Sequence, residues 1–190
     1  MRPIVVAFLA SAAAFAQTTL PSLSTEVRVK WAMIGTVGPA NLAGGVVSSG
    51  WSTFFNRPPE YGPHWDGFGK RYGIRLVDGA ISNSMEAGLG ALWGEDPRYY
   101  PMRSGESPGR RIKYAVKQAF LARDRNGKTM PAYARYAAYT GSSFLSNAWR
   151  VDSDSQASDA LFRTGLGFTA RMTSNLFTEF WPDIIHIIRH

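Results

Sequence analysis

The feature that most constrains this chain is the stretch from Trp31 to Asn56, which contains no ionisable side chain. The stretch is not strongly apolar, because Gly, Ala, Ser and Thr make up much of it. Small residues at this density allow helix backbones to approach one another closely. A similar composition returns in 67–94 and 131–149. The sequence therefore predicts a domain of closely packed, small-residue-rich segments.

The first 16 residues have the pattern of a secretory signal peptide. Arg2 precedes an apolar run from Ile4 to Leu9, and Ala14-Phe15-Ala16 fits a signal peptidase site. An N-terminal membrane anchor or a buried helix is the alternative, but the run is about half as long as a membrane span requires. We expect residues 1–16 to be removed. Removing 16 of the 190 residues leaves 174, enough for a single domain over 17–190.

Cysteine usage and charge narrow the chemistry further. The chain has no cysteine, so it contains no disulfide, thiolate nucleophile, Cys-ligated metal or lipid-modified cysteine. Its net charge of +7 favours anionic partners. For an exported protein, we expect anionic lipid or a cell-wall polymer rather than nucleic acid, and we expect no cofactor.

Start and stop signals divide the chain into about five helices, so the expected fold is an all-α, single-domain bundle. Ser24 or Thr25 is expected to cap the first helix, which should break at Pro39. Asp66 is the expected N-cap of a helix over 67–94. Ser107, followed by proline, should begin a shorter helix.

The second half of the chain leaves one boundary open. Asn126-Gly127 either ends the short helix, which we favour, or forms the turn of a hairpin between 120–123 and 128–133. A further segment should run over 131–149. Asp152 and Asp154 are expected in the cap and first turn of the last helix, which Pro182 should stop.

The helix over 67–94 carries a regular apolar pattern. Residues three or four positions apart are expected to form its buried face: Ile74, Val77, Ile81, Met85, Leu89 and Trp93. Arg75, Asp78 and Glu86 should occupy the other faces. Each of its glycines costs about 1 kcal/mol of helix stability relative to alanine. We therefore expect neighbouring helices to pack closely on these glycines, Gly88 included.

The strongest candidate for catalysis is the loop that contains His64 and Asp66. A histidine near a carboxylate is able to act as a general base, and a nearby serine would be the nucleophile of a hydrolase. No G-x-S-x-G or H-E-x-x-H motif accompanies this loop. An exposed loop histidine without catalytic function is the simpler interpretation.

Two acidic clusters are candidates for ligand binding. Glu95 and Arg98 lie beside two tyrosines, where they would bind a polar ligand or form an ion-paired corner at a helix end. Asp152 and Asp154 have calcium-binding chemistry, but the spacing and glycine of an EF-hand loop are absent. The corner and the helix cap are the simpler interpretations, and we expect no metal site.

The short helix after Ser107 is strongly basic on one side. Its apolar stripe contains Ile112, Ala115, Val116, Ala119 and Phe120, and its cations are Arg110, Arg111, Lys113 and Lys117. We expect these four cations to be the contact surface for an anionic membrane or polymer. The alternative is an ordinary solvated face.

The uncharged stretch also has the length of a membrane span. Residues 31–51 would extend about 30 Å as a helix, with a tryptophan at each end. Its glycines, Pro39 and Asn41 make it a poor span on its own. We expect it to be buried within a folded domain, with a membrane-inserted helical protein as the alternative.

Several short motifs resemble those of a group of uncharacterised exported bacterial proteins, chiefly acidobacterial. They are Pro58-Pro59-Glu60-Tyr61-Gly62, Gly67-Phe68-Gly69-Lys70-Arg71-Tyr72-Gly73, Glu95-Asp96-Pro97-Arg98-Tyr99, Ala122-Arg123-Asp124 and Glu179-Phe180-Trp181-Pro182-Asp183. The resemblance implies an exported single-domain protein in which these segments are corners, and it implies no activity. The expected function is a structural or binding role in the periplasm or at the outer membrane.

Overall fold

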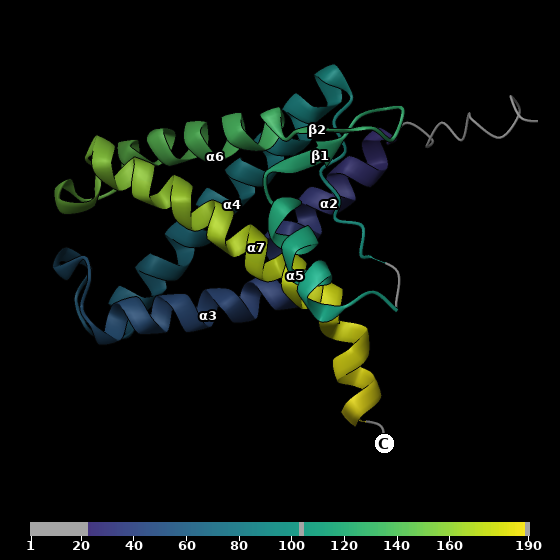
Figure 1. Ribbon diagram of the computed structural model, residues 1–190. Coiled ribbons are helices and arrows are strands. Elements are labelled where there is room, and N and C mark those ends of the chain that lie inside the picture. Colours follow the sequence, from purple (N-terminus) through teal and green to yellow (C-terminus); the bar gives the residue numbers. More distant parts are fainter. Residues whose placement is uncertain (1–22, 103–104, 189–190) are drawn as a thin grey trace, which may run out of the picture.

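The computed structural model describes residues 23–102 and 105–188, which form a mostly helical single domain, as predicted (Figure 1). The expected signal peptide and its cleavage site lie outside the described residues. Five of the described helices have 13 residues or more: α2 (Thr25–Val37), α3 (Pro39–Phe54), α4 (Trp65–Trp93), α6 (Tyr133–Leu145) and α7 (Ala157–Ile188). A shorter helix, α5 (Pro108–Lys117), precedes a small two-stranded hairpin.

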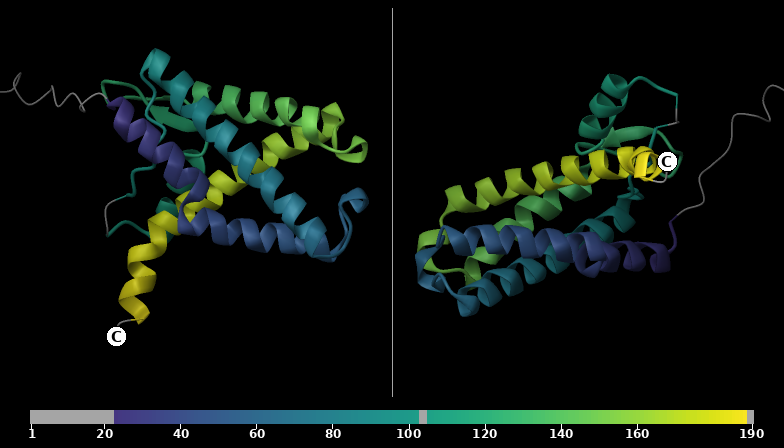
Figure 2. Two further views of the ribbon diagram at one scale, coloured as in Figure 1. Left: turned by 180° about the vertical axis from the view of Figure 1, so that it is seen from behind. Right: turned by 90° about the horizontal axis from the view of Figure 1, so that it is seen from below.

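Helix α4 is the centre of the domain. It packs against α2, α3 and α6, while α7 packs against α6 and α5. Helices α3 and α6 lie at opposite edges of the molecule, and α7 runs diagonally between them (Figure 1). The C-terminal part of α7 projects beyond the other helices (Figure 2).

Several helix ends lie where local sequence signals predict them. The Ser24 hydroxyl accepts a hydrogen bond from the backbone N–H of Val27, as an N-cap does. Helix α2 ends before Pro39, which is the first residue of α3. Gly94 ends α4 with a φ of 79°, a left-handed conformation that glycine adopts at little cost.

Three predicted boundaries are wrong. His64, not Asp66, is the N-cap residue of α4, although its side chain makes no capping bond. Asp152–Asp154 forms a separate 3-10 turn before α7 begins. Helix α7 also continues through Pro182, and Arg111 binds the carboxylates of Glu179 and Asp183 on either side of that proline.

The predicted helix stop at Asn126-Gly127 is also wrong, and the hairpin alternative is confirmed. Strands β1 (Leu121–Arg123) and β2 (Thr129–Pro131) pair antiparallel. Asp124 stabilises the turn, since its carboxylate accepts from the backbone N–H groups of Asn126 and Lys128, both at 2.8 Å. Gly127 has a φ of 75°. The local hydrogen bonds of Asp124 therefore favour a turn over a continued helix.

The prediction of close packing at the glycines of α4 is wrong for most of them. A Cβ atom built at Gly69, Gly73, Gly79 or Gly88 would meet no atom within 4 Å. At Gly90 it would lie 3.1 Å from both the Arg28 guanidinium and the Glu95 carbonyl oxygen. Close approach is therefore found at the two ends of α4, at Gly90 and at Gly67, where a Cβ atom would lie 2.6 Å from the Tyr61 carbonyl oxygen.

Candidate functional site

The interior of this domain is polar. Among the described residues, the buried apolar side chains are Tyr61 and eight alanines. The largest side chains with less than 2% exposure include Arg135, Glu86, Glu95, Glu179 and Asn175. Soluble proteins ordinarily bury large aliphatic side chains and expose charged ones. Here that arrangement is largely reversed.

A buried ion pair between Glu86 and Arg135 joins α4 to α6. The Arg135 Nε lies 2.9 Å from a Glu86 carboxylate oxygen, and both side chains are almost fully buried. Arg135 Nη1 also donates to the carbonyls of Gln118, Ala119 and Leu121 at 2.8–3.3 Å. Arg171 of α7 approaches the same carboxylate at 3.9 Å. One arginine therefore neutralises a buried acid and satisfies carbonyls at the end of α5.

Glu95 is a structural centre of the corner that follows α4. Its carboxylate accepts from the Trp93 indole N–H at 3.0 Å and from the backbone N–H of Ala134 at 2.9 Å. Its backbone carbonyl accepts from Arg28 of α2 at 2.8 Å. This predicted ligand-binding residue is thus buried and connects α2, α4 and the start of α6.

Arg98, the other candidate in this corner, forms an ion pair with Asp96 at 2.9 Å. The hydroxyl of Tyr100 donates to the same carboxylate at 2.7 Å. Burial alone would raise the pKa of Asp96, but the hydrogen bonds from Arg98 and Tyr100 outweigh it and hold the pKa below its usual value. Burial and the Asp96 carboxylate raise the pKa of Tyr100 to about 12. The corner is an internal ion-paired structure.

Glu179 anchors α5 to α7 and changes the interpretation of the basic helix. Its carboxylate accepts from Arg111 Nε at 2.9 Å, from the backbone N–H of Met102 at 3.0 Å and from the Tyr99 hydroxyl. Burial opposes ionisation of Glu179, yet these donors lower its pKa below the usual value. The prediction that Arg111 faces a ligand is therefore wrong, because this guanidinium is paired inside the protein.

The remaining basic residues of α5 are exposed. Arg110 pairs with Glu106 at 2.7 Å across one helical turn. Lys113 and Lys117 form no ion pair with any residue in 23–102 or 105–188. The predicted four-cation surface is thus reduced to two unpaired lysines.

A third polar cluster joins α4 to the α6–α7 connection. Arg150 binds the carboxylates of Asp78 and Asp154, and Arg163 lies 3.1 Å from Asp154. Asp154, considered above for calcium, is therefore paired with two arginines. Metal-type clusters of three or more His, Cys, Asp or Glu side chains are absent from the described part of the chain.

Large apolar side chains lie on the outside of the domain. They occur on α2, α3, α4, α6 and α7, and examples from each are Met33, Val47, Trp51, Phe54, Val77, Phe144, Leu161, Phe162, Phe177 and Trp181. Val47 is 72% exposed and Phe54 is 81% exposed. The predicted burial of the α4 apolar stripe is wrong for Val77 and Trp93. The predicted burial of the uncharged stretch is wrong for most of its large side chains, although Trp31 and Leu42 are half-buried. The apolar pattern marks an outer face.

Hydroxyl side chains on these helices bond to their own backbone. The hydroxyls of Thr36, Ser52, Thr53, Thr164, Thr169, Thr173 and Thr178 each donate to the carbonyl four residues earlier, at 2.7–3.0 Å. Such bonds satisfy a hydroxyl without water or a partner side chain. The faces that carry them are therefore compatible with an apolar surrounding.

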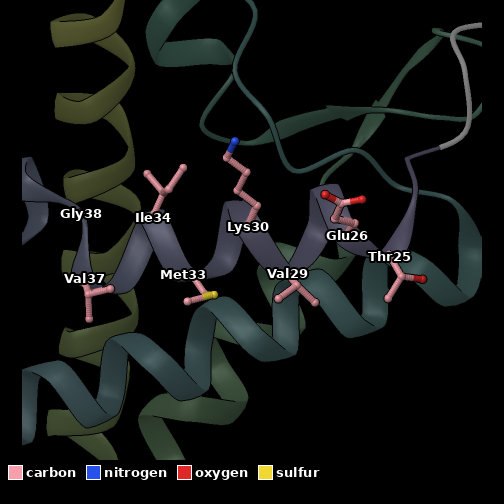
Figure 3. Close-up of a pocket in the computed structure, with 8 residues that line it drawn as sticks. All are labelled: Thr25, Glu26, Val29, Lys30, Met33, Ile34, Val37 and Gly38. Carbon is pink, nitrogen blue, oxygen red and sulfur yellow. The ribbon is translucent and has the colours of Figure 1, made fainter.

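An apolar groove runs along α2 (Figure 3). Val29, Met33 and Val37 point to the same side of the helix, while Lys30 and Ile34 point to the other. Val29 and Met33 are both more than half exposed. Helix α2 thus contributes to the outer apolar surface rather than to a buried core.

The candidate hydrolase residues are separated from this polar interior. His64 is exposed at the start of α4, and Asp66 is an exposed partner of Lys70 at 4.0 Å. No hydrogen bond joins the side chains of His64 and Asp66. Among the described residues, neither forms a hydrogen bond with a serine or with the Glu95 corner.

Comparison with models of protein families, with curated proteins and with solved structures finds no match to this chain. Among the described helices, none is both long enough and apolar enough to cross a membrane.

Sequence reasoning missed the polar interior, although one signal for it was present. Glu86 and Arg135 are 49 residues apart, and nothing local to either residue identifies its partner. The sequence places the acidic residues Glu86 and Asp78 on the same small-residue-rich helix as the apolar stripe. This combination is the signal, because either the acidic side chains or the apolar stripe could face the other helices. Periodicity separates the two faces of a helix, but it does not say which face is buried.

Proposed function

We propose that this protein is an exported cell-envelope protein that binds lipid through the apolar faces of its helices. The observation that carries the proposal is the reversed distribution of side chains, with paired charges inside and large apolar groups outside. Lipid hydrocarbon would cover the apolar faces, and the internal ion pairs would keep the charges away from it. The role is structural or binding rather than catalytic.

The size of the hydrophobic effect supports the proposal that lipid covers the exposed apolar side chains. Moving one Val, Leu or Phe side chain out of water contributes about 1.5–3 kcal/mol. The free energy gained by covering five such side chains would therefore be similar to the whole free energy of unfolding of a typical domain, about 5–15 kcal/mol. The exposed apolar groups here occur on six helices, α2 to α7, with Ile112 on α5. The free energy available from covering them is therefore large.

Lipid explains the distribution of these faces better than a single protein partner does. Helices α3 and α6 lie at opposite edges of the domain, and both expose large apolar side chains (Figure 1). An interface with one partner would cover one patch, whereas lipid surrounds a protein on several sides. The unpaired Lys113 and Lys117 would add electrostatic attraction of about 1 kcal/mol each at an anionic surface.

Membrane fractionation of cells that produce the protein tests this proposal. Because apolar contacts are not screened by ions, we expect the protein to stay with membranes through a high-salt wash and to be released by detergent. Val47→Lys should weaken retention, whereas Asn126→Lys, which adds the same charge at the exposed hairpin turn, should not. Complete release of the unaltered protein by salt, or equal retention of both variants, would contradict lipid contact through α3.

A further inference from the structure

Arg75 of α4 differs from the other arginines that lie between the helices. Seven others bond to carboxylates or carbonyls: Arg28, Arg71, Arg111, Arg135, Arg150, Arg163 and Arg171. Arg75 makes no hydrogen bond or ion pair with any residue that the structure describes, and its Nε is buried. Burial lowers the pKa of Arg75, since few charges offset its desolvation.

Among the described residues, no carboxylate near Arg75 is free to bind it. A Cβ atom at Gly45 of α3 would lie 3.2 Å from Arg75 Nε and 2.8 Å from the Tyr72 ring, so glycine leaves room for both side chains. Helix α3 lies within the stretch that has no ionisable residue. Asp78, one turn further along α4, is already paired with Arg150. Within 23–102 and 105–188, the guanidinium therefore has no counter-ion.

We infer that Arg75 binds a phosphate-type oxyanion supplied by the headgroup of an anionic lipid. A guanidinium presents paired N–H donors that match phosphate oxygens, and partial burial strengthens the contact. Val46, which follows the buried Gly45 and is half exposed, would lie against an acyl chain of the same lipid. The inference rests on the proposed lipid contact and adds a site and a headgroup charge to it.

Vesicle binding with matched variants tests the inference. The protein and its Arg75→Gln and Lys70→Gln variants are titrated with vesicles of phosphatidylglycerol and of phosphatidylcholine. Both variants remove one positive charge from α4, but Lys70 is exposed and already faces Asp66. We expect Arg75→Gln to lose about fivefold in affinity for phosphatidylglycerol only, and Lys70→Gln to lose about twofold or less. Circular-dichroism melts without lipid should show that Arg75→Gln is at least as stable as the parent, because an unpaired cation is removed.

The possible outcomes distinguish a failure of the Arg75 site from a failure of the proposed lipid contact. Equal losses in the two variants would overturn the Arg75 site, while binding to both vesicle types would still support lipid contact. Absence of binding to either vesicle would contradict both. Inorganic phosphate is the third probe: if it raises the melting temperature of the parent but not of Arg75→Gln, and vesicles show no difference, the anion is free phosphate and the lipid source is wrong.

Discussion

At the scale of single residues, the largest fully buried side chains are mostly charged or polar, and arginines satisfy them. Arg135 alone contacts a carboxylate of α4 and three carbonyls at the end of α5. A leucine in this position would leave the Glu86 charge and these carbonyls without a donor. Removing one partner of such a buried pair is costly because the other charge stays behind, unpaired.

Glu86→Gln should therefore lower the free energy of unfolding by about 3–5 kcal/mol. Glu106→Gln is the matched control, since it removes the partner of Arg110 from an exposed pair worth at most about 1 kcal/mol. Denaturant unfolding of both variants in the same detergent provides the measurement. A small, equal loss in the two variants would show that Arg135 is not held by Glu86.

Substitutions of two glycines of α4, Gly88 and Gly90, test where the helix packs closely against its neighbours. Gly88→Ala should stabilise the protein by about 1 kcal/mol, because its added methyl meets no atom and alanine favours the helix. Gly90→Ala should destabilise it, since the same methyl would lie 3.1 Å from the Glu95 carbonyl oxygen. Thermal melts of both variants under the same conditions provide the measurement. Stabilisation by both changes would show that the corner after α4 rearranges to accommodate the extra methyl group at position 90.

At the scale of elements, some helix ends were predictable from local signals, whereas other helix ends and the buried faces were not. The cap at Ser24, the break at Pro39 and the stop at Gly94 depend on backbone chemistry within a few residues. The ion pairs of Arg111 on either side of Pro182 join residues about 70 positions apart in sequence, so no local signal predicted them. The predicted corner at Glu95 and Arg98 was similarly local, but its connections to α2 and α6 were not.

The corner after α4 should stabilise the protein less at acidic pH. Hydrogen bonds lower the pKa of Asp96 in the folded protein, so its contribution is present above the unfolded value of about 3.9 and is lost as pH falls through the lowered pKa. Tyr100→Phe removes one of these bonds, which should raise that pKa and move the acid-induced loss of stability to higher pH.

Unfolding measured at a series of pH values checks this expectation. Tyr133→Phe is the control, because Tyr133 is an exposed tyrosine that does not contact Asp96. Identical acid profiles for Tyr100→Phe and Tyr133→Phe would contradict the role assigned to the Tyr100 hydroxyl.

At the scale of the whole molecule, the chain is inverted relative to a soluble domain. The sequence was sufficient to predict a single all-α domain, because the small residues and the helical spacing are both local properties. The same pattern was compatible with burial in a protein core or with an outer apolar face. Only the pairing of distant charges, as in Glu86 with Arg135 and Glu179 with Arg111, decides between the two.

Spin labelling tests most directly whether the outer faces contact lipid. Because the chain has no cysteine, a nitroxide can be attached at a single introduced site, Val47→Cys on α3 or Asn126→Cys in the hairpin turn. In liposomes, the label at position 47 should be accessible to oxygen and protected from a water-soluble nickel chelate, whereas the label at 126 should be accessible to the chelate. Equal access of the nickel chelate to both labels would contradict lipid contact through this face.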